Sequence, residues 1–162
     1  THMLDPSKSF LQPEPSPAQV GHTFIMVMGS PDISASLDFW QAYFSNDVVG
    51  PIPYRIGVLS EAYDLPVETQ HQLALVSMVD GYGIEIDQYP KEATSVPAPK
   101  NERGGVILVS LQVDPSGLKA SLPWALSYKN DEGEEEGGVV ILPSGTPIEV
   151  SFTEPLLPAA IE

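Results

Sequence analysis

The spacing of hydrophobic residues near the start of this chain predicts a strand followed by a helix. Apolar residues at 23–27 are typical of a buried strand, and a turn follows at 29–32. Beyond the turn, apolar residues recur three or four positions apart, which predicts an amphipathic helix over 33–45 with Asp32 as its N-cap. The stripe that would pack this helix onto a core consists of Ile33, Leu37, Trp40 and Phe44.

Shorter elements follow this helix. The Gly- and Pro-rich residues 50–55 predict a loop with a short strand, and residues 59–65 predict a helical turn. A strand over 72–79 then leads through a hairpin signal at 80–81 into a strand over 82–88. The first half of the chain therefore reads as a strand, a helix and then strands.

The second half repeats this order. Residues 106–113 predict a buried strand, and apolar spacing predicts a short helix over 117–126 whose regularity Pro123 limits. The charged segment 131–138 is predicted to lie between two strands, of which the second is 139–142, and a last strand is predicted over 148–152. The order βαβββ thus occurs twice, which predicts an α+β fold built from two similar modules.

A short sequence repeat supports the two modules. Residues 81–86 and 145–150 both follow the pattern Gly-x-x-Ile-Glu-(Ile/Val), with Glu85 and Glu149 at the same place. Neighbouring residues of a strand point to opposite faces, so each glutamate points away from the aliphatic side chains beside it. If those aliphatic side chains form the core, each carboxylate faces solvent or a cavity.

Proline-rich segments mark the module boundaries. Pro13, Pro15 and Pro17 predict an extended or disordered arm, and residues 1–3 at its start resemble the remnant of a cleaved tag. A non-periodic, proline-containing stretch in the middle of the chain predicts a linker. The predicted organisation is an arm at 1–19, a first module at 20–89, a linker at 90–104, a second module at 105–153 and a tail at 154–162.

The charge of the chain limits its partners. Twenty-two acidic residues against seven Lys and Arg give a net charge of −15 over 162 residues. A nucleic-acid partner needs a basic surface, and an anionic membrane surface is disfavoured for the same reason, so we expect neither. The chain has no cysteine, which excludes disulfides, thiolate metal sites and thiol nucleophiles and fits a cytoplasmic protein.

One acidic segment has two interpretations. Residues 131–138 carry five carboxylates and three glycines between two predicted strands. A solvated hairpin end is the simpler interpretation, and calcium binding is the alternative, although the spacing of the carboxylates matches no known calcium loop.

The order of these motifs resembles the vicinal oxygen chelate superfamily, which includes glyoxalase I, extradiol dioxygenases, fosfomycin-resistance enzymes and bleomycin-binding proteins. Residues 22–27 and 32–40 resemble the opening strand and helix of that family, and 81–86 resembles the closing strand of a module. In the second module, 109–114 and 142–150 resemble the opening strand and the ending. The resemblance implies two curved sheets of βαβββ topology around a shared cavity, formed within one chain or across a homodimer.

The resemblance also implies a site. Metal ligands of the family, carried over by position, fall on His22, Glu85, Glu149 and Leu108, and the last of these has no donor atom. One imidazole and two carboxylates can hold Mn²⁺, Fe²⁺, Ni²⁺, Zn²⁺ or Mg²⁺, or the site contains no metal. Glu85 or Glu149 can instead act as a catalytic base.

Several residues are candidates for contact with a substrate. Arg55 can pair with a substrate carboxylate. His71 can supply the metal ligand that Leu108 does not provide, or it is a residue at the edge of a strand without a role in the site. Trp124 and Tyr128 can line a pocket mouth, although the sequence does not fix their direction. The predicted substrate-binding set is Tyr54, Arg55, His71 and Leu108.

Two functions follow from the resemblance. The first is a metal-assisted lyase or isomerase, or a related dioxygenase-type enzyme, that acts on a small molecule beside a carbonyl or vicinal oxygens. The alternative is a metal-free protein that binds an antibiotic-like or aromatic ligand without chemistry. The glutamates and His22 favour the enzyme, whereas Leu108 favours the binding protein.

Overall fold

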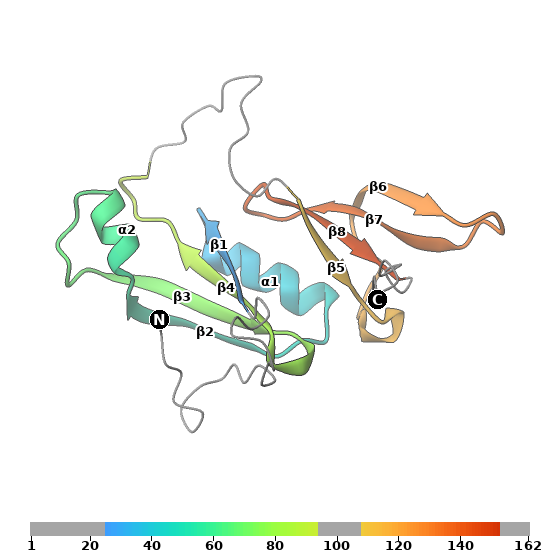
Figure 1. Cartoon of the computed structure of the whole chain (residues 1–162), viewed down its shortest axis with the longest axis horizontal. Helices are drawn as coiled ribbons and strands as arrows, with labels where there is room; N and C mark the ends of the chain where they lie inside the picture. The colour runs from blue at the N-terminus through green and yellow to red at the C-terminus, as the bar shows by residue number, and fades with distance from the viewer. Residues whose placement is uncertain (1–24, 94–107, 153–162) are drawn as a thin grey trace, which may run out of the picture. The chain divides into compact units, whose positions relative to one another are not determined.

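The computed structural model describes residues 25–93 and 108–152 and divides the chain into two compact units. Unit 1 comprises Thr1–Gln41 and Asn46–Thr94, and unit 2 comprises Ala42–Ser45 and Ser95–Glu162. Each unit is described by itself. Figure 1 labels the elements of both units.

Unit 1 is a four-stranded mixed sheet with two helices. The strand order is β1-β4-β3-β2, in which β1 is parallel to β4 and the other neighbours are antiparallel. The elements are β1 (Ile25–Ser30), α1 (Ile33–Tyr43), β2 (Val48–Arg55), α2 (Gly57–Ala62), β3 (Gln70–Ser77), the 3₁₀ turn Val79–Gly81 and β4 (Gly83–Gln88).

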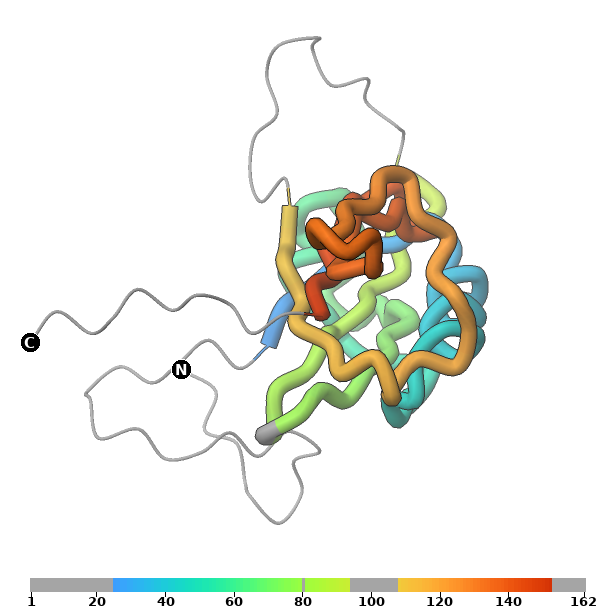
Figure 2. Tube along the Cα trace, turned by 90° about the vertical axis from the view of Figure 1, so that its right-hand side faces the viewer, coloured from blue at the N-terminus to red at the C-terminus, as the bar shows by residue number. Residues whose placement is uncertain are grey.

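Helix α1 lies on one face of this sheet and closes the core of unit 1 (Figure 2). The hydroxyls of Ser30 and Ser36 are 2.8 Å apart, and the Gln88 Oε1 accepts a hydrogen bond from the Ile33 N–H at 2.7 Å. These contacts fix α1 against the strand face that carries the buried aliphatic side chains. The predicted stripe is confirmed, since Trp40 is 1% exposed and the core comprises Met28, Ile33, Leu37, Trp40, Ala74, Val76, Ile84 and Ile86.

The segment predicted as a loop with a short strand forms the eight-residue strand β2. The strand is irregular between Val49 and Ile52, where the pairing with β3 shifts. Gly50 adopts φ +114°, and a Cβ there would lie 2.8 Å from the Leu73 carbonyl oxygen. Glycine is required at this position because the backbone of β2 approaches that of β3 closely.

Unit 2 contains a second sheet with the same topology. The strand order is β5-β8-β7-β6, again with the first pair parallel and the others antiparallel. The elements are β5 (Val109–Gln112), the 3₁₀ turn Pro115–Gly117, β6 (Trp124–Lys129), β7 (Glu135–Ile141) and β8 (Pro147–Ser151). The predicted α+β class with two related modules is confirmed by the two sheets of the same strand order, although the described part of unit 2 has a 3₁₀ turn where a helix was predicted.

The helix predicted over 117–126 is wrong. A single 3₁₀ turn at Pro115–Gly117 is capped by the Asp114 carboxylate, which accepts the Ser116 N–H at 2.8 Å, and strand β6 begins at Trp124. Pro123 disfavours a helical conformation at Leu122 and lacks the N–H that a helix needs. The apolar spacing instead reflects the burial of Leu122, which is 4% exposed.

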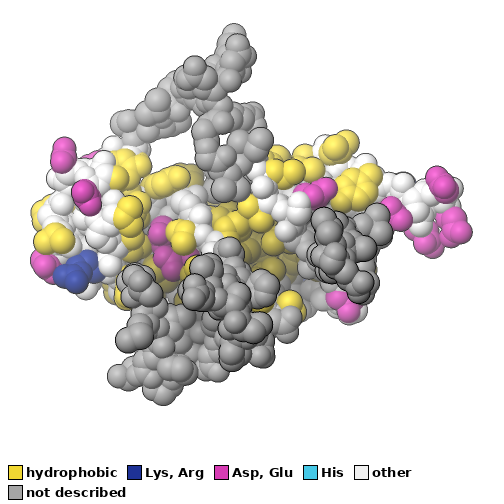
Figure 3. All heavy atoms as spheres, in the orientation of Figure 1, with side chains coloured by type: hydrophobic (Ala, Val, Ile, Leu, Met, Phe, Trp, Pro, Cys, Tyr) yellow, Lys and Arg dark blue, Asp and Glu magenta, His cyan; other side chains and the backbone are white. Residues whose placement is uncertain are grey.

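The acidic segment 131–138 is a shorter turn than predicted. Strand β7 starts at Glu135, and the Asn130 Oδ1 accepts the N–H groups of Glu132 and Glu134 at 3.0 and 2.9 Å. The side chains of this turn are exposed, and the acidic tip projects from the β6–β7 hairpin in Figure 3. This arrangement is typical of a hairpin turn stabilised by an asparagine.

Candidate functional site

Glu85 and Glu149 occupy equivalent places in the two sheets. Glu85 lies on β4 between Val27 of β1 and Leu75 of β3. Glu149 lies on β8 between Ser110 of β5 and Val139 of β7. Each is partly exposed and alternates with fully buried aliphatic neighbours, so each points away from the core of its own sheet. The sequence repeat therefore marks the same structural position twice.

The strand registers correct one equivalence drawn from the sequence. Val27 pairs with Glu85, and Ser110 pairs with Glu149, so Leu108 corresponds to Ile25 rather than to His22. Both equivalent positions therefore carry an aliphatic side chain without a donor atom. His22 lies outside the described residues, and its role stays a prediction.

In unit 1, Glu85 shares its sheet face with a second carboxylate, Asp87. The two residues alternate along β4, and Asp87 pairs with Gly29 on one side and Leu73 on the other. The side chain of Asp87 is 5% exposed, and its Oδ1 has no hydrogen-bond partner. The sequence analysis did not select Asp87, although the Glu-x-Asp spacing on a predicted strand was a signal that could have found it.

Hydrophobic side chains surround these two carboxylates. Across the sheet, one row contains Val27, Glu85, Leu75 and Val49, and the next contains Gly29, Asp87, Leu73 and Ile52. Val27, Val49 and Ile52 are exposed. Figure 3 shows acidic side chains set within a hydrophobic surface over the strands of unit 1. The face is thus apolar, with charge at its centre.

This environment changes the ionisation of Asp87. Burial, the charge of Glu85 and a hydrogen bond to Glu85 together raise the pKa of Asp87 from 3.8 to about 7. Two carboxylates this close do not both ionise readily, because their like charges repel in a poorly solvated place. Near neutral pH the pair therefore tends to hold one proton.

In unit 2, Glu149 is held by hydroxyl groups. The Ser110 hydroxyl donates a hydrogen bond to Oε2 of Glu149, and the Tyr128 hydroxyl lies 3.4 Å from Oε1. Burial and the negative charge of Glu149 raise the pKa of Tyr128, which keeps its hydroxyl protonated as a donor. The structure thus fixes the direction of Tyr128, which the sequence left open.

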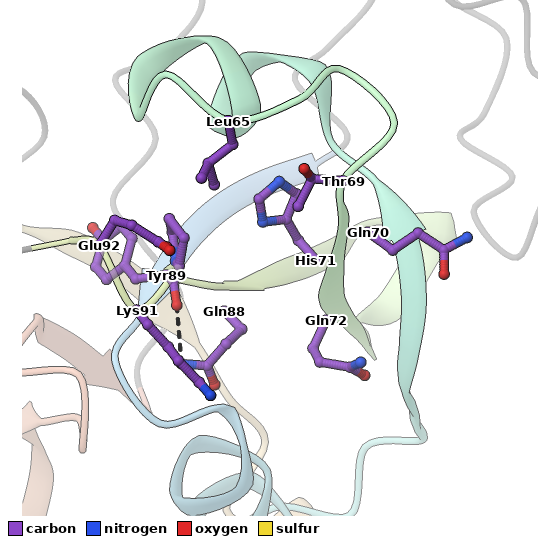
Figure 4. Close-up of a pocket in the computed structure, with 10 residues that line it drawn as sticks. Leu65, Thr69, Gln70, His71, Gln72, Gln88, Tyr89, Lys91 and Glu92 are labelled. Atoms are coloured by element: carbon purple, nitrogen blue, oxygen red, sulfur yellow. Dashed lines mark hydrogen bonds between the residues drawn. The ribbon is translucent and has the colours of Figure 1, made fainter.

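His71 lies at a separate pocket in unit 1. This pocket has a volume of about 260 Å³ and lies between the start of β3 and the segment after β4, with Thr69, His71 and Lys91 among its lining residues (Figure 4). His71 is 5% exposed, and its Nε2 lies 3.0 Å from the hydroxyl of the buried Ser60. The imidazole is therefore a buried, hydrogen-bonded group that also borders a cavity.

The Ser60–His71 contact leads to a stability prediction. Ser60→Ala removes the only recorded partner of His71 Nε2 in the described part of the chain, and an unsatisfied buried polar group costs about 1–3 kcal/mol. We expect urea unfolding to show a loss of this size. The exposed Ser34→Ala on α1 is the matched control and should change stability by less than about 0.5 kcal/mol. Equal stabilities of the two variants would contradict the contact.

The remaining predicted substrate-binding residues are exposed. Tyr54 pairs with His71 across β2 and β3 and is 56% exposed. Arg55 forms a surface ion pair with Glu68 at 3.3 Å, so its guanidinium already has a carboxylate partner. Leu108 is exposed and precedes Ser110 on the strand face that carries Glu149. The structure therefore places Tyr54 opposite His71 on the neighbouring strand. It places Leu108 directly before β5, the strand that pairs with the strand of Glu149.

The donor set of the described residues does not fit a divalent metal ion. Among these residues no group of three or more His, Asp or Glu side chains is arranged to hold one. The residue paired with Glu85 is Val27, which has no donor atom, and a transition metal needs several nitrogen, oxygen or sulfur donors together. A metal site would depend on His22, which lies outside the described residues.

Known structures of the glyoxalase-like fold are similar to this chain. A glyoxalase family protein from Bacillus cereus has a TM-score of 0.53 and 13% identity over 85% of this chain and 97% of its own. Two further structures are less similar. Lactoylglutathione lyase from Agrobacterium tumefaciens has a TM-score of 0.46 and 14% identity over 84% of this chain and 95% of its own. The fosfomycin resistance protein FosX from Mesorhizobium loti has a TM-score of 0.47 and 10% identity over 84% of this chain and 94% of its own. No family model and no curated protein sequence matches the chain.

The fold of the chain is therefore glyoxalase-like. The Bacillus cereus protein supports this at the level of fold, and the two sheets of identical strand order agree with it. At this level the resemblance found in the sequence is confirmed. In the described residues, no helix has the length and apolar character that crossing a bilayer requires.

Proposed function

We propose that this protein is an enzyme that moves a proton at a carbon beside a carbonyl group of a small molecule, as a lyase or an isomerase does. The observation that carries the proposal is the Glu85–Asp87 pair at the centre of an apolar sheet face. General acid–base catalysis is most efficient when the pKa of the catalytic group lies near the working pH. The pKa of Asp87 is about 7, so the carboxylate pair that contains the catalytic Glu85 gains or loses a proton near neutral pH.

The two carboxylates have different roles in this proposal. Glu85 is partly exposed and takes the proton from the substrate carbon, because it can reach a ligand on the sheet face. Asp87 is buried beside Glu85 and affects the reaction through Glu85, because a proton on Asp87 lowers the negative charge of the carboxylate pair. The surrounding apolar side chains lower the local polarity, which strengthens the interactions of the developing negative charge on the substrate.

Glu149 is the equivalent carboxylate of unit 2, and we assign it a second acid–base role. The metal-assisted form of the reaction, which the sequence analysis predicted, needs His22 as a ligand beside Glu85 or Glu149. The proposal assigns proton transfer to the carboxylates, and a bound metal ion would add polarisation of the carbonyl group.

Hydrogen–deuterium exchange tests the proposal. The purified protein is incubated in D₂O with hydroxyacetone, dihydroxyacetone and glycolaldehyde, and proton NMR follows the loss of the C–H signals beside the carbonyl group. We expect catalysed exchange with at least one compound, and Glu85→Gln should lower its rate by about 10²-fold or more. Glu61→Gln, at an exposed position of α2, is the matched control. Absence of exchange with all three compounds, or equal rates for both variants, would contradict the proposal.

Binding without chemistry is the second candidate function. It is favoured by Leu108, which has no donor atom where the resemblance implies a ligand, and by the exposed Val27 and Ile52 on the same face as Glu85. Such a surface suits an apolar or aromatic ligand. Saturable binding of a neutral aromatic probe such as 2-naphthol, together with no deuterium exchange, would favour this function over the enzyme.

A further inference from the structure

Both carboxylate oxygens of Glu149 are engaged by side chains from other strands of its sheet. Ser110 donates to Oε2 from β5, the parallel neighbour of β8. Tyr128 donates to Oε1 at 3.4 Å from β6. In the strand order β5-β8-β7-β6, strand β6 is not a neighbour of β8, so the tyrosine side chain must cross β7 to reach Glu149.

Gly137 makes this crossing possible. It lies on β7 and pairs with Tyr128 on one side and with Ser151 of β8 on the other. A Cβ at this position would lie closest to the backbone carbonyl oxygen of Val150 on β8, and next closest, at 2.6 Å and 2.9 Å, to the Oη and Cζ of Tyr128. A side chain there would therefore displace the ring. The backbone of Gly137, at φ +155°, also lies in a region that residues with a side chain rarely adopt.

We propose that Tyr128 is a positioning residue that orients the Glu149 carboxylate for reaction, and that Gly137 provides the space for it. The inference rests on the proposed function, in which Glu149 is an acid–base group. One hydrogen bond to each oxygen fixes the plane of the carboxylate, and a carboxylate has further lone pairs that stay available to a ligand. A fixed reacting group raises the rate, because misplacement by about 1 Å can reduce it by about 10²-fold.

A purely structural role explains this arrangement poorly. Glu149 is partly exposed, so water alone could satisfy its carboxylate. Two dedicated donors, together with a strand position kept free of any side chain, control the direction of the carboxylate rather than its solvation. The equivalent Glu85 has no such hydroxyl neighbours on β1 and β3, where Val27 and Leu75 flank it. The two glutamates are therefore positioned in different ways.

The experiment compares Tyr128→Phe with Tyr63→Phe, a matched loss of one tyrosine hydroxyl in unit 1. The ¹³Cδ resonance of Glu149, assigned with Glu149→Gln in protein labelled at glutamate, reports the hydrogen bonds of the carboxylate at constant pH. We expect Tyr128→Phe to shift this resonance and Tyr63→Phe to leave it in place.

The deuterium-exchange assay supplies the second readout. Tyr128→Phe should lower kcat by about 10- to 100-fold and leave KM nearly unchanged. An unmoved Glu149 resonance, or a moved resonance with an unchanged exchange rate, would overturn the inference. If the wild-type protein exchanges no deuterium at all, the proposed function fails, and the resonance still decides whether Tyr128 holds Glu149.

Discussion

Asp87→Asn is expected to stabilise the protein at pH 8 and to remove a fall in stability that the wild type shows as the pH rises. The pKa of Asp87 is raised from 3.8 to about 7 in the folded protein, so the folded state binds its proton more tightly than the unfolded chain does. The free energy of unfolding therefore falls from about pH 4 to about pH 7 and levels off above that. Below about pH 4 Asp87 is protonated in both the folded and the unfolded state, so its ionisation no longer affects the free energy of unfolding.

The magnitude follows from the same shift. Each pKa unit corresponds to about 1.4 kcal/mol, so ionisation of Asp87 costs the folded state on the order of a few kcal/mol at pH 8. Asparagine has a similar shape and no charge, and the variant avoids this cost. Urea unfolding at pH 5 and at pH 8 measures the difference, and Asp38→Asn on the exposed side of α1 is the control. Parallel stability curves for the wild type and Asp87→Asn would contradict the interpretation.

Trp40→Ala is expected to destabilise the protein by about 3–5 kcal/mol. Trp40 is 1% exposed and contacts Phe39 edge to face, at a distance of 6.1 Å between ring centroids. Removing a buried indole leaves a large cavity, and the loss combines its transfer free energy with the cost of that cavity. Thermal or urea unfolding measures the loss. Val58→Ala, at a position 71% exposed, should change stability by less than about 0.5 kcal/mol. A loss below about 1 kcal/mol for Trp40→Ala would show that α1 does not close the core.

The sequence predicted the parts of the fold that depend on local hydrophobic spacing. The stripe of α1 and the strands β3, β4 and β8 were found because their apolar residues recur with the period of a single element. The helix over 117–126 failed, because Leu118 and Leu122 have helical spacing, whereas Pro123 prevents the backbone from following it. Spacing alone does not distinguish a helix from an extended segment with one buried leucine.

The candidate site was predictable only in part. Glu85 and Glu149 were found because each belongs to a repeated motif, and strand alternation fixed the face on which each lies. The equivalence between His22 and Leu108 failed because it depends on strand register, which no spacing within one strand determines. Asp87 and Tyr128 gain their properties from residues on other strands, and a single sequence does not reveal such neighbours.

The prolines of β2 affect how the protein meets other copies of itself. Within its sheet β2 is an edge strand, and it exposes the hydrophobic residues Val49 and Ile52. A free edge with such side chains invites pairing with a strand of another molecule. Pro51 and Pro53 lack the N–H groups that such pairing needs, and the irregularity at Gly50 bends the edge. The same segment that looked like a loop in the sequence thus protects the sheet from aggregation.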